Sequence, residues 1–380
     1  YRFDNNSANL GGAIYNESGT FNLSNSVFNN NTAKMSGGAI YNNYELYNPD
    51  NSKKLFDRFN VSNSTFNKNF AKSFGGAINN YGVMTIKNSV FNENQAEYGG
   101  GVSNSADMTI SNSVFGSNKY TYYYHISSLN SETNPDVTVE RLANTATYGA
   151  GFYNSGMAEV TKSTFLNNDA TKNGGGIYNG FVLDVLYTDF HNNTAKENGG
   201  AIYSIDTSNS EYGNSPSSIT IYKSNFYTNS ANENGGAVYL DKSSNTTVAE
   251  ENIIKSSIFG TPYQMGNKAK NGGAIYNANY VKTTITSTSF LNNKADKGGD
   301  IYNAGVMTIS NSYFGDFGST IKNGYYVYSK GGLKRVTSVS KIDKNLNENL
   351  DYTYGQKIEK AISGGAIYND STGDLSIIKS

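Results

Sequence analysis

The sequence predicts an all-β fold in which one short unit of β-strands repeats as the coils of a solenoid. Two short motifs alternate along the chain at a fixed spacing, and apolar residues recur at the same positions of successive copies. These apolar positions alternate with polar ones, which is the period of a half-buried strand. Because Asn, Gly, aromatic and β-branched residues disfavour long helices, we expect a single-stranded parallel β-helix.

The first motif is Gly-Gly-Ala-Ile or a close variant. Its copies begin at Gly11, Gly37, Gly75, Gly99, Gly149, Gly174, Gly199, Gly235, Gly272, Gly298 and Gly364. The second motif, Phe-x-x-Asn-x-Ala, begins at Phe3, Phe28, Phe66, Phe91, Phe165, Phe190, Phe226 and Phe290, whereas Phe115, Phe259 and Phe314 keep only the phenylalanine. The uninterrupted unit is about 25 residues long. About eleven coils at a spacing of about 4.8 Å would form a rod roughly 50 Å long.

The strand that follows each Gly-Gly pair has a predicted inner and outer side. The Gly-Gly pair itself marks a tight corner that requires positive φ or close backbone packing. The Ile14 column is apolar in every copy and is expected to face the core. The preceding column is Ala or Gly in ten copies and Asp300 in one, and we expect it to face outward. A further aliphatic column, as at Leu23 and Val61, lies five residues before each Phe.

Stacking of coils places like residues above like, and this predicts three ladders. The phenylalanines are expected to stack as an aromatic file inside the rod. The Asn column after GGAIY, as at Asn16 and Asn42, suits a turn in which stacked amides satisfy one another. The Ser/Thr column two residues before each Phe, as at Ser26 and Ser64, is expected to form a hydroxyl ladder.

The whole chain, 1–380, is expected to form one elongated domain, because each coil contacts only its neighbours. Insertions occur at two places in the unit and should project from the edges of the rod, where solenoids vary their binding surface. They are expected at about 43–55, 119–141, 204–217, 240–250, 260–266 and 315–360. The chain starts at a Phe motif and stops before the next Phe is due, so we expect a segment of a longer protein, truncated mid-coil at both ends.

The composition excludes several classes of site. The 380 residues contain no Cys and two His, which excludes disulfide scaffolds and Cys-ligated metal sites. Thirty basic and 31 acidic residues give a net charge of −1, so we expect no nucleic-acid partner. No apolar run reaches about 18 residues, so no membrane span is expected in this segment. The apolar fraction of 37% could indicate disorder, but the ordered motifs argue against it.

The alternation of GGAIYN, as at 37–42, with FxxNxA, as at 28–33, resembles the repeats of chlamydial polymorphic outer-membrane proteins. It is even more similar to the Asn- and Tyr-rich adhesin-like surface proteins of methanogenic archaea. The resemblance covers essentially the whole chain apart from the insertions. It implies a right-handed β-helix, export to the cell surface and a role in attachment, and it brings no catalytic residues.

A parallel β-helix can also carry polysaccharide-active enzymes, which need clustered carboxylates. Asp300 has no acidic partner in adjacent copies and is interpreted as a surface substitution. Asp184, Asp189 and His191 lie close in sequence but fit a solvated edge, and His125 fits packing within a loop. We therefore expect no catalytic residue, no metal and no cofactor, and a carbohydrate-active enzyme is the less favoured alternative.

The candidate contact surface is the tyrosine column that follows each Ile of GGAIY. This position accepts Asn79 and Ser103 in two copies, so it should face outward and form a stripe of phenols that binds sugars or proteins. The alternative is that the rings stack only to stabilise the ladder. Its members are Tyr15, Tyr41, Tyr153, Tyr178, Tyr203, Tyr239, Tyr276, Tyr302 and Tyr368. Similar candidates in the insertions, for which packing within the loops is the alternative, are Tyr122, Tyr123, Tyr124, Tyr325 and Tyr326.

These features predict a non-catalytic, extracellular adhesin-like stalk at the cell surface or cell wall that presents its edge loops. The expected partner is a glycan or protein of another cell, or neighbouring copies of the chain in a fibre or layer. A structural segment of an extracellular fibre or envelope layer is therefore the first alternative function.

Overall fold

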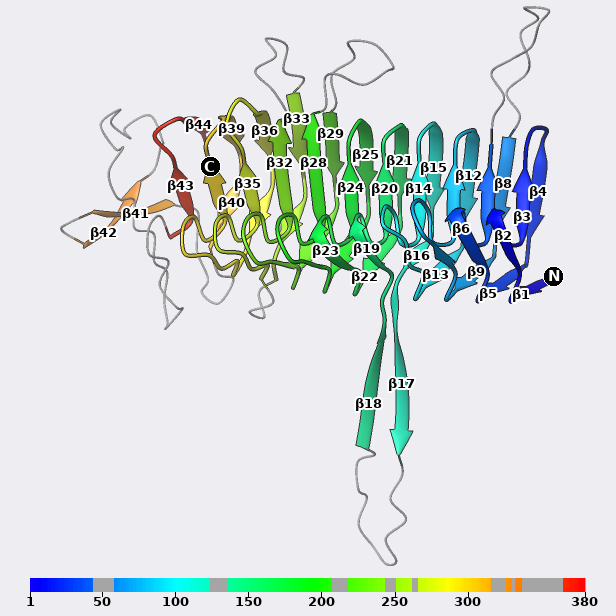
Figure 1. Cartoon of the computed structure of the whole chain (residues 1–380). Helices are drawn as coiled ribbons and strands as arrows, with labels where there is room; N and C mark the ends of the chain where they lie inside the picture. The colour runs from blue at the N-terminus through cyan, green and yellow to red at the C-terminus, as the bar shows by residue number, and fades with distance from the viewer. Residues whose placement is uncertain are drawn as a thin grey trace, which may run out of the picture.

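The computed structural model shows a right-handed parallel β-helix in which three long sheets extend along one rod (Figure 1). Each of the three sheets has eleven parallel strands, one from each coil. Connections between parallel strands are almost always right-handed, and the coils of this β-helix follow that rule. The predicted fold class is therefore confirmed. The structure describes residues 1–43, 58–123, 136–206, 218–242, 251–261, 266–315, 325–329, 332–336 and 365–379.

The first sheet holds the GGAIY strands in unbroken register, so that Ile14 pairs with Ile40 and Tyr15 with Tyr41. Its strands are β3 (Ile14–Asn16), β7 (Ile40–Asn42), β11 (Ile78–Asn80), β14 (Val102–Asn104), β20 (Phe152–Asn154), β24 (Ile177–Asn179), β28 (Ile202–Asp206), β32 (Val238–Lys242), β35 (Ile275–Asn277), β38 (Ile301–Asn303) and β43 (Ile367–Asn369).

The second sheet holds longer strands that alternate buried and partly exposed residues, as the period of two predicts. Its strands are β4 (Phe21–Ser24), β8 (Arg58–Ser62), β12 (Val83–Lys87), β15 (Asp107–Ser111), β21 (Met157–Thr161), β25 (Val182–Leu186), β29 (Ser218–Tyr222), β33 (Glu251–Lys255), β36 (Lys282–Thr286), β39 (Val306–Ser310) and β44 (Asp374–Ile378).

The third sheet carries the phenylalanine of each second motif. Its strands are β1 (Arg2–Asp4), β5 (Val27–Asn29), β9 (Thr65–Asn67), β13 (Val90–Asn92), β16 (Val114–Phe115), β22 (Thr164–Leu166), β26 (Asp189–His191), β30 (Asn225–Tyr227), β34 (Ile258–Phe259), β37 (Ser289–Phe290) and β40 (Tyr313–Phe314). The coil then returns to the first sheet through short strands, namely β2 (Ser7–Leu10), β6 (Thr32–Ser36), β10 (Phe70–Ala71), β19 (Thr145–Tyr148), β23 (Asp169–Asn173), β27 (Thr194–Ala195) and β31 (Ser230–Ala231).

The phenylalanines form the predicted file through the centre of the core. Eleven rings, from Phe3 to Phe314, stack with centroids 4.6–5.2 Å apart and nearly parallel planes. The nine rings from Phe28 to Phe290 are completely buried. We call the eleven stacked residues from Phe3 to Phe314 the phenylalanine file.

Two ladders of asparagine amides run beside the core. The predicted one follows GGAIY, where Asn42 Nδ2 donates to Asn80 Oδ1 at 2.7 Å and Asn80 donates both to Asn104 and to the Gly82 carbonyl of its own turn. The second ladder is formed by the Asn of Phe-x-x-Asn-x-Ala, to which the sequence analysis assigned no role. Its members are Asn6, Asn31, Asn69, Asn94, Asn144, Asn168, Asn193, Asn229, Asn267 and Asn293.

The Gly-Gly corner explains why one predicted direction is wrong. Gly37 has a φ of 68°, and a Cβ on Gly38 would lie 1.9 Å from the Gly76 carbonyl oxygen. At this corner the N–H groups of both Ala39 and Ile40 donate to the carbonyl of Ala77. The two successive side chains are therefore not on opposite sides, and Ala39 is completely buried. The Ala/Gly column faces inward, and Asp300 within it is buried rather than a surface substitution.

The predicted hydroxyl ladder has a different bonding pattern. The backbone N–H of Ser64 donates to the Ser89 hydroxyl at 3.3 Å, and the Ser89 hydroxyl donates to the Lys87 carbonyl two residues earlier. Hydroxyls such as that of Ser89 thus connect backbone groups of adjacent coils. The small residues are needed because the column is buried at a tight turn.

Two insertions begin later than expected. Strands β28 and β32 continue to Asp206 and Lys242, with Ile205 paired to Asp241. Ser204 therefore belongs to the amide ladder, where its hydroxyl accepts a hydrogen bond from Asn179, and Leu240 belongs to the core. The insertions expected at 204–217 and 240–250 therefore start after Asp206 and Lys242.

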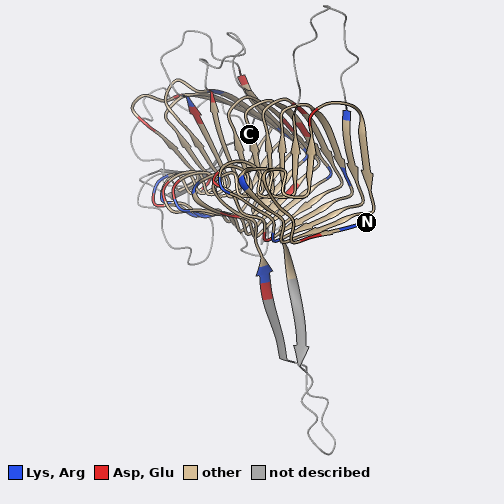
Figure 2. Ribbon diagram, turned by 45° about the vertical axis from the view of Figure 1, so that its right-hand side comes forward, with Lys and Arg blue, Asp and Glu red and all other residues tan. Residues whose placement is uncertain are grey.

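Within the insertion expected at 119–141, β17 (Ser117–Tyr123) and β18 (Asp136–Leu142) form an antiparallel hairpin. This hairpin, which we call the arm, projects far from the side of the rod (Figure 1). A second antiparallel pair, β41 (Tyr325–Ser329) and β42 (Gly332–Val336), lies within the insertion expected at 315–360. Charged residues of the rod lie mainly at turns along its edges (Figure 2).

Candidate binding surfaces

The predicted tyrosine column lies on the outer side of the first sheet. From Tyr153 to Tyr302 six rings stack in succession with centroids 4.6–5.1 Å apart, and the ring of Tyr368 follows at 4.9 Å, tilted by 31° from that of Tyr302. Tyr15 and Tyr41 form a separate pair at 5.4 Å. We call these nine residues the tyrosine stripe. The structure thus brings together all nine predicted members, although in two groups.

Stacking determines which part of each phenol reaches solvent. Because the ring faces cover one another along the rod, a stacked tyrosine presents its edge and hydroxyl rather than a flat platform. Tyr203 and Tyr302 are 6% and 8% exposed, whereas Tyr15, at the end of its pair, is 46% exposed. The uninterrupted part of the stripe can therefore offer hydrogen bonds to a partner but no free ring face.

Two carboxylates accept hydrogen bonds from the stripe. The Tyr203 hydroxyl donates to Asp241 at 2.5 Å, and the Tyr302 hydroxyl donates to Asp370 at 2.8 Å. Burial and the neighbouring Asp241 charge raise the pKa of Tyr203, and burial raises the pKa of Tyr153 to about 12. Tyr203 and Tyr153 therefore stay neutral at physiological pH, and Tyr203 acts as a hydrogen-bond donor.

A second aromatic column, which the sequence analysis missed, lies beside the stripe. The residue before Gly-Gly is aromatic in three successive copies, and Phe74 stacks on Tyr98 at 4.8 Å and Tyr98 on Tyr148 at 5.3 Å. Tyr98 also meets Tyr153 of the stripe edge-on at 5.2 Å. The signal in the sequence was this short aromatic run, which is replaced by Asn173, Asn198, Asn234 and Asn271 in the following copies.

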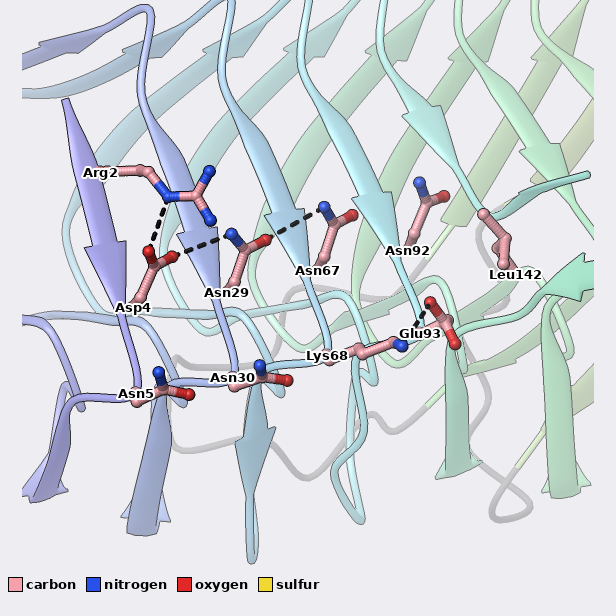
Figure 3. Close-up of a pocket in the computed structure, with 10 residues that line it drawn as sticks. All are labelled: Arg2, Asp4, Asn5, Asn29, Asn30, Asn67, Lys68, Asn92, Glu93 and Leu142. Carbon is pink, nitrogen blue, oxygen red and sulfur yellow. Dashed lines mark hydrogen bonds and ion pairs between the residues drawn. The ribbon is translucent and has the colours of Figure 1, made fainter. Parts of the chain in front are cut away.

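A polar groove of about 430 Å³ lies on the outer side of the third sheet, beside the base of the arm (Figure 3). The residues that follow the phenylalanine in four successive coils line it, and Asn29 Nδ2 donates to Asp4 Oδ1 while Asn67 Nδ2 donates to Asn29 Oδ1. Arg2 pairs with Asp4 at 2.6 Å. The lining residues are Arg2, Asp4, Asn5, Asn29, Asn30, Asn67, Lys68, Asn92, Glu93 and Leu142.

The groove combines amides with balanced charges, so it suits a polar ligand rather than an apolar one. Lys68 and Glu93 on its rim lie 3.7 Å apart, and Leu142 belongs to the arm. On the other side of the arm the same column carries Leu166, His191 and Tyr227. There the rings of His191 and Tyr227 stack at 4.9 Å, and burial lowers the pKa of His191.

The base of the arm is joined to the turns of the rod. Arg141 Nη2 donates to the carbonyls of Asn167 and Asn192, and Asn167 Nδ2 donates to the Ser117 carbonyl and to Asn118. The Ser117 hydroxyl donates to Asn92 of the groove at 3.0 Å. These bonds give the first residues of the arm a fixed position next to the groove.

The tyrosines predicted in the insertions are placed only by their backbone. Tyr122 and Tyr123 end β17, and Tyr325 and Tyr326 begin β41. Tyr124 and His125 lie outside the described residues.

The acidic residues weighed for catalysis do not converge. Asp184 lies on the second sheet, whereas Asp189 lies on the third sheet and accepts a hydrogen bond from Asn225. Asp300 accepts one from Asn293 at 2.8 Å and so ends the second amide ladder. Burial raises the pKa of Asp300 to about 7. Within the described ranges, no group of three His, Asp or Glu residues is arranged to hold a metal ion.

The model of the Chlamydia polymorphic membrane protein repeat matches the chain four times, at residues 2–17, 25–43, 162–180 and 187–205. The matched segments cover about a fifth of the chain and contain both motifs of the unit. The chain therefore contains repeats similar to those of the Chlamydia polymorphic membrane proteins. Neither a curated protein nor a solved structure matches it significantly. The described part of the chain holds no helix long and apolar enough to cross a membrane.

Proposed function

We propose that the chain is a cell-surface adhesin stalk, in which a stiff rod holds variable projections away from the cell for attachment to other cells, surfaces or glycans. The proposal is supported by the type of repeat and by the separation between the rod and its projections. The work of such a stalk is mechanical and recognitional, without turnover of a substrate.

The observation that carries the proposal is that the arm leaves the rod without disturbing it. Phe115 pairs with Phe91 before it and with Phe165 after it, although the arm is inserted directly after Phe115 in the chain. The second amide ladder likewise continues from Asn94 through Asn144 to Asn168. The chain thus adds length outside the rod while the phenylalanine file and the second amide ladder continue past the arm, which is the arrangement expected of a scaffold that presents its projections.

Two deletions test the proposal, and their end points are chosen from the spacing of the repeat. Removing residues 118–143 leaves Phe115, Gly116, Ser117 and Asn144, which restores the Phe-x-x-Asn spacing of an uninterrupted coil. Removing residues 317–358 similarly joins Asp316 to Glu359 and restores the distance from Phe314 to the Gly-Gly pair at Gly364. Both variants should therefore keep the rod.

The measurement is attachment of protein-coated fluorescent beads to cultured cells and to immobilised polysaccharides. We expect each deletion to reduce attachment, while the β-sheet circular dichroism spectrum and the melting temperature stay close to those of the full chain. Unchanged attachment after both deletions would contradict the proposal. Release of products from a panel of cell-wall and plant polysaccharides would contradict its non-catalytic part.

A further inference from the structure

The tyrosine stripe is interrupted for two successive coils at one place. In the register of the first sheet Tyr41 is followed by Asn79, then by Ser103, and then by Tyr153. Two ring positions are therefore occupied by short polar side chains, with a tyrosine on either side. We call Asn79 and Ser103 together the notch.

The polar atoms of the notch are buried without hydrogen-bond partners. Asn79 and Ser103 are both completely buried, and Asn79 Nδ2, Asn79 Oδ1 and Ser103 Oγ have no partner among the described residues. Nearly all buried amides in folded proteins are hydrogen-bonded. The neighbouring residue Asn80 follows that rule, because it donates both to Asn104 and to Gly82. The notch is thus an exception within the same strand, and it needs a specific explanation.

Aromatic side chains cover the notch. Phe74 precedes Asn79 in the same coil, yet its ring lies 6.3 Å from that of Tyr153, two coils further along the rod. Tyr98 meets Tyr153 edge-on, and Tyr81 leans against Tyr41 at 5.7 Å. To reach Tyr153, the rings of Phe74 and Tyr98 bridge the coils that carry Asn79 and Ser103, a position from which they can shield the two short side chains. Phe74 and Tyr98 are themselves only half-buried.

Phe74 and Tyr98 would act through their side chains, so changes of rotamer can move them without altering the coils. Opening would expose an amide and a hydroxyl at the bottom, flanked by the rings of Tyr41 and Tyr153. In the uninterrupted stripe the face of each ring is covered by the next phenol. At the notch the faces of Tyr41 and Tyr153 have no neighbouring phenol of the stripe, so a ligand can stack on them there. Opening would also allow the unpaired polar atoms to form hydrogen bonds, which offsets the cost of opening.

We propose that the notch is a binding site for a neutral pyranose unit of a glycan, with Phe74 and Tyr98 as a movable cover. The amide of Asn79 both donates and accepts, as does the hydroxyl of Ser103, and this matches the alternating donors and acceptors of sugar hydroxyls. The flanking aromatic rings suit the apolar face of a pyranose. A charged ligand is disfavoured because the bottom of the notch has no charge to compensate it. This inference rests on the proposed attachment function and assigns it a ligand class.

Isothermal titration calorimetry with cellobiose, lactose and N,N′-diacetylchitobiose tests the site in the full chain. We expect at least one of these disaccharides to bind. Replacing Asn79 by Tyr, the residue of nine other copies, should fill the notch and weaken that binding by about tenfold or more, equivalent to about 1.4 kcal/mol. Asn79→Leu, which keeps the branched shape and the number of side-chain heavy atoms but removes the polar atoms, should weaken it similarly without lowering the melting temperature.

A matched control separates the notch from any other break in the stripe. Tyr239→Asn creates a short polar side chain at the same position of another coil, where the residue before Gly-Gly is Asn234 and no aromatic cover exists in that column. This variant should keep the disaccharide affinity of the wild type. Failure of all three disaccharides to bind, or unchanged affinity in both Asn79 variants, overturns the inference. If the coated beads still attach to cells in that case, the attachment function stands without the notch.

Discussion

The phenylalanine file and the tyrosine stripe are built by the same repeat with the same spacing, yet they differ in continuity. The file runs through eleven coils without a break, with centroids 4.6–5.2 Å apart. The stripe has comparable spacing but is interrupted at Asn79 and Ser103. A missing ring in the core leaves a cavity, whereas a missing ring on the outer side can be covered by neighbouring side chains. A break in the outer column therefore costs little stability, and it can serve as a ligand-binding site.

The largest effect is expected from removing one ring of the file. Phe190→Ala leaves a cavity between Phe165 and Phe226, both of which stack on Phe190 within 5.0 Å. We expect a loss of about 3–5 kcal/mol in the free energy of unfolding. Urea denaturation followed by circular dichroism measures it. A loss below about 1 kcal/mol would show that the file is not the main support of the core.

The next effect concerns Asp300, the one buried acidic residue in the described part of the chain. Because burial raises the pKa of Asp300 to about 7, the folded protein keeps a proton that the unfolded chain loses near its ordinary value of 3.8. The contribution of protonated Asp300 is therefore complete at low pH and is lost as the pH rises from about 4 to about 7. The expected slope is at most about 1.4 kcal/mol per pH unit.

Asp300→Asn isolates this contribution from those of other titrating groups, because an amide oxygen can still accept the hydrogen bond from Asn293. Stability against urea, measured at several pH values between 4 and 8, should fall with pH more steeply in the wild type than in the variant. Parallel curves for the two proteins would contradict the burial of a titrating carboxyl at this position.

A rung of the second amide ladder should come next. Asn193→Leu removes the acceptor used by both the N–H and the side-chain amide of Asn168, and removes the donor to Phe165 O and to Asn229. Unpaired buried groups predict a loss of about 2–3 kcal/mol. Asn60→Ala, which breaks an exposed pair with Asn22, is the matched control and should cost less than about 0.5 kcal/mol. Equal losses in the two variants would contradict a distinction between inner and outer amides.

The smallest effect is expected in the stripe. Tyr178→Ala removes a ring that stacks on Tyr153 and Tyr203 at 5.0 Å but lies on the outer side of the sheet. We expect a loss of about 1–2 kcal/mol, because stacking and partial burial of the ring are lost but no enclosed cavity forms on the outer side of the sheet. The melting temperatures of Tyr178→Ala and Phe190→Ala, measured side by side, compare the contributions of the stripe and the file to stability. Similar melting temperatures for the two alanine variants would mean that the stripe supports the rod as strongly as the file does.

Much of this fold follows from the sequence because coils stack in register. Once Phe28, Phe66 and Phe91 occupy equivalent positions, they must lie above one another, and the same holds for Ile40 and Ile78. The length of the unit, the apolar columns, the file and the first amide ladder all follow from this single constraint. The tyrosine stripe follows as well, since its members share one position of the unit.

The tertiary structure decided what periodicity does not specify. The inward direction of Ala39 and Asp300 depends on the backbone path through the Gly-Gly corner, where a period of two no longer applies. The complete burial of Asn79, and the contacts of Phe74 and Tyr98 with Tyr153, join residues of different columns and different coils, so they do not follow from the residue type at one repeat position. The sequence thus determines which residues are stacked, whereas corners and side chains that cross between columns determine which of them remain accessible.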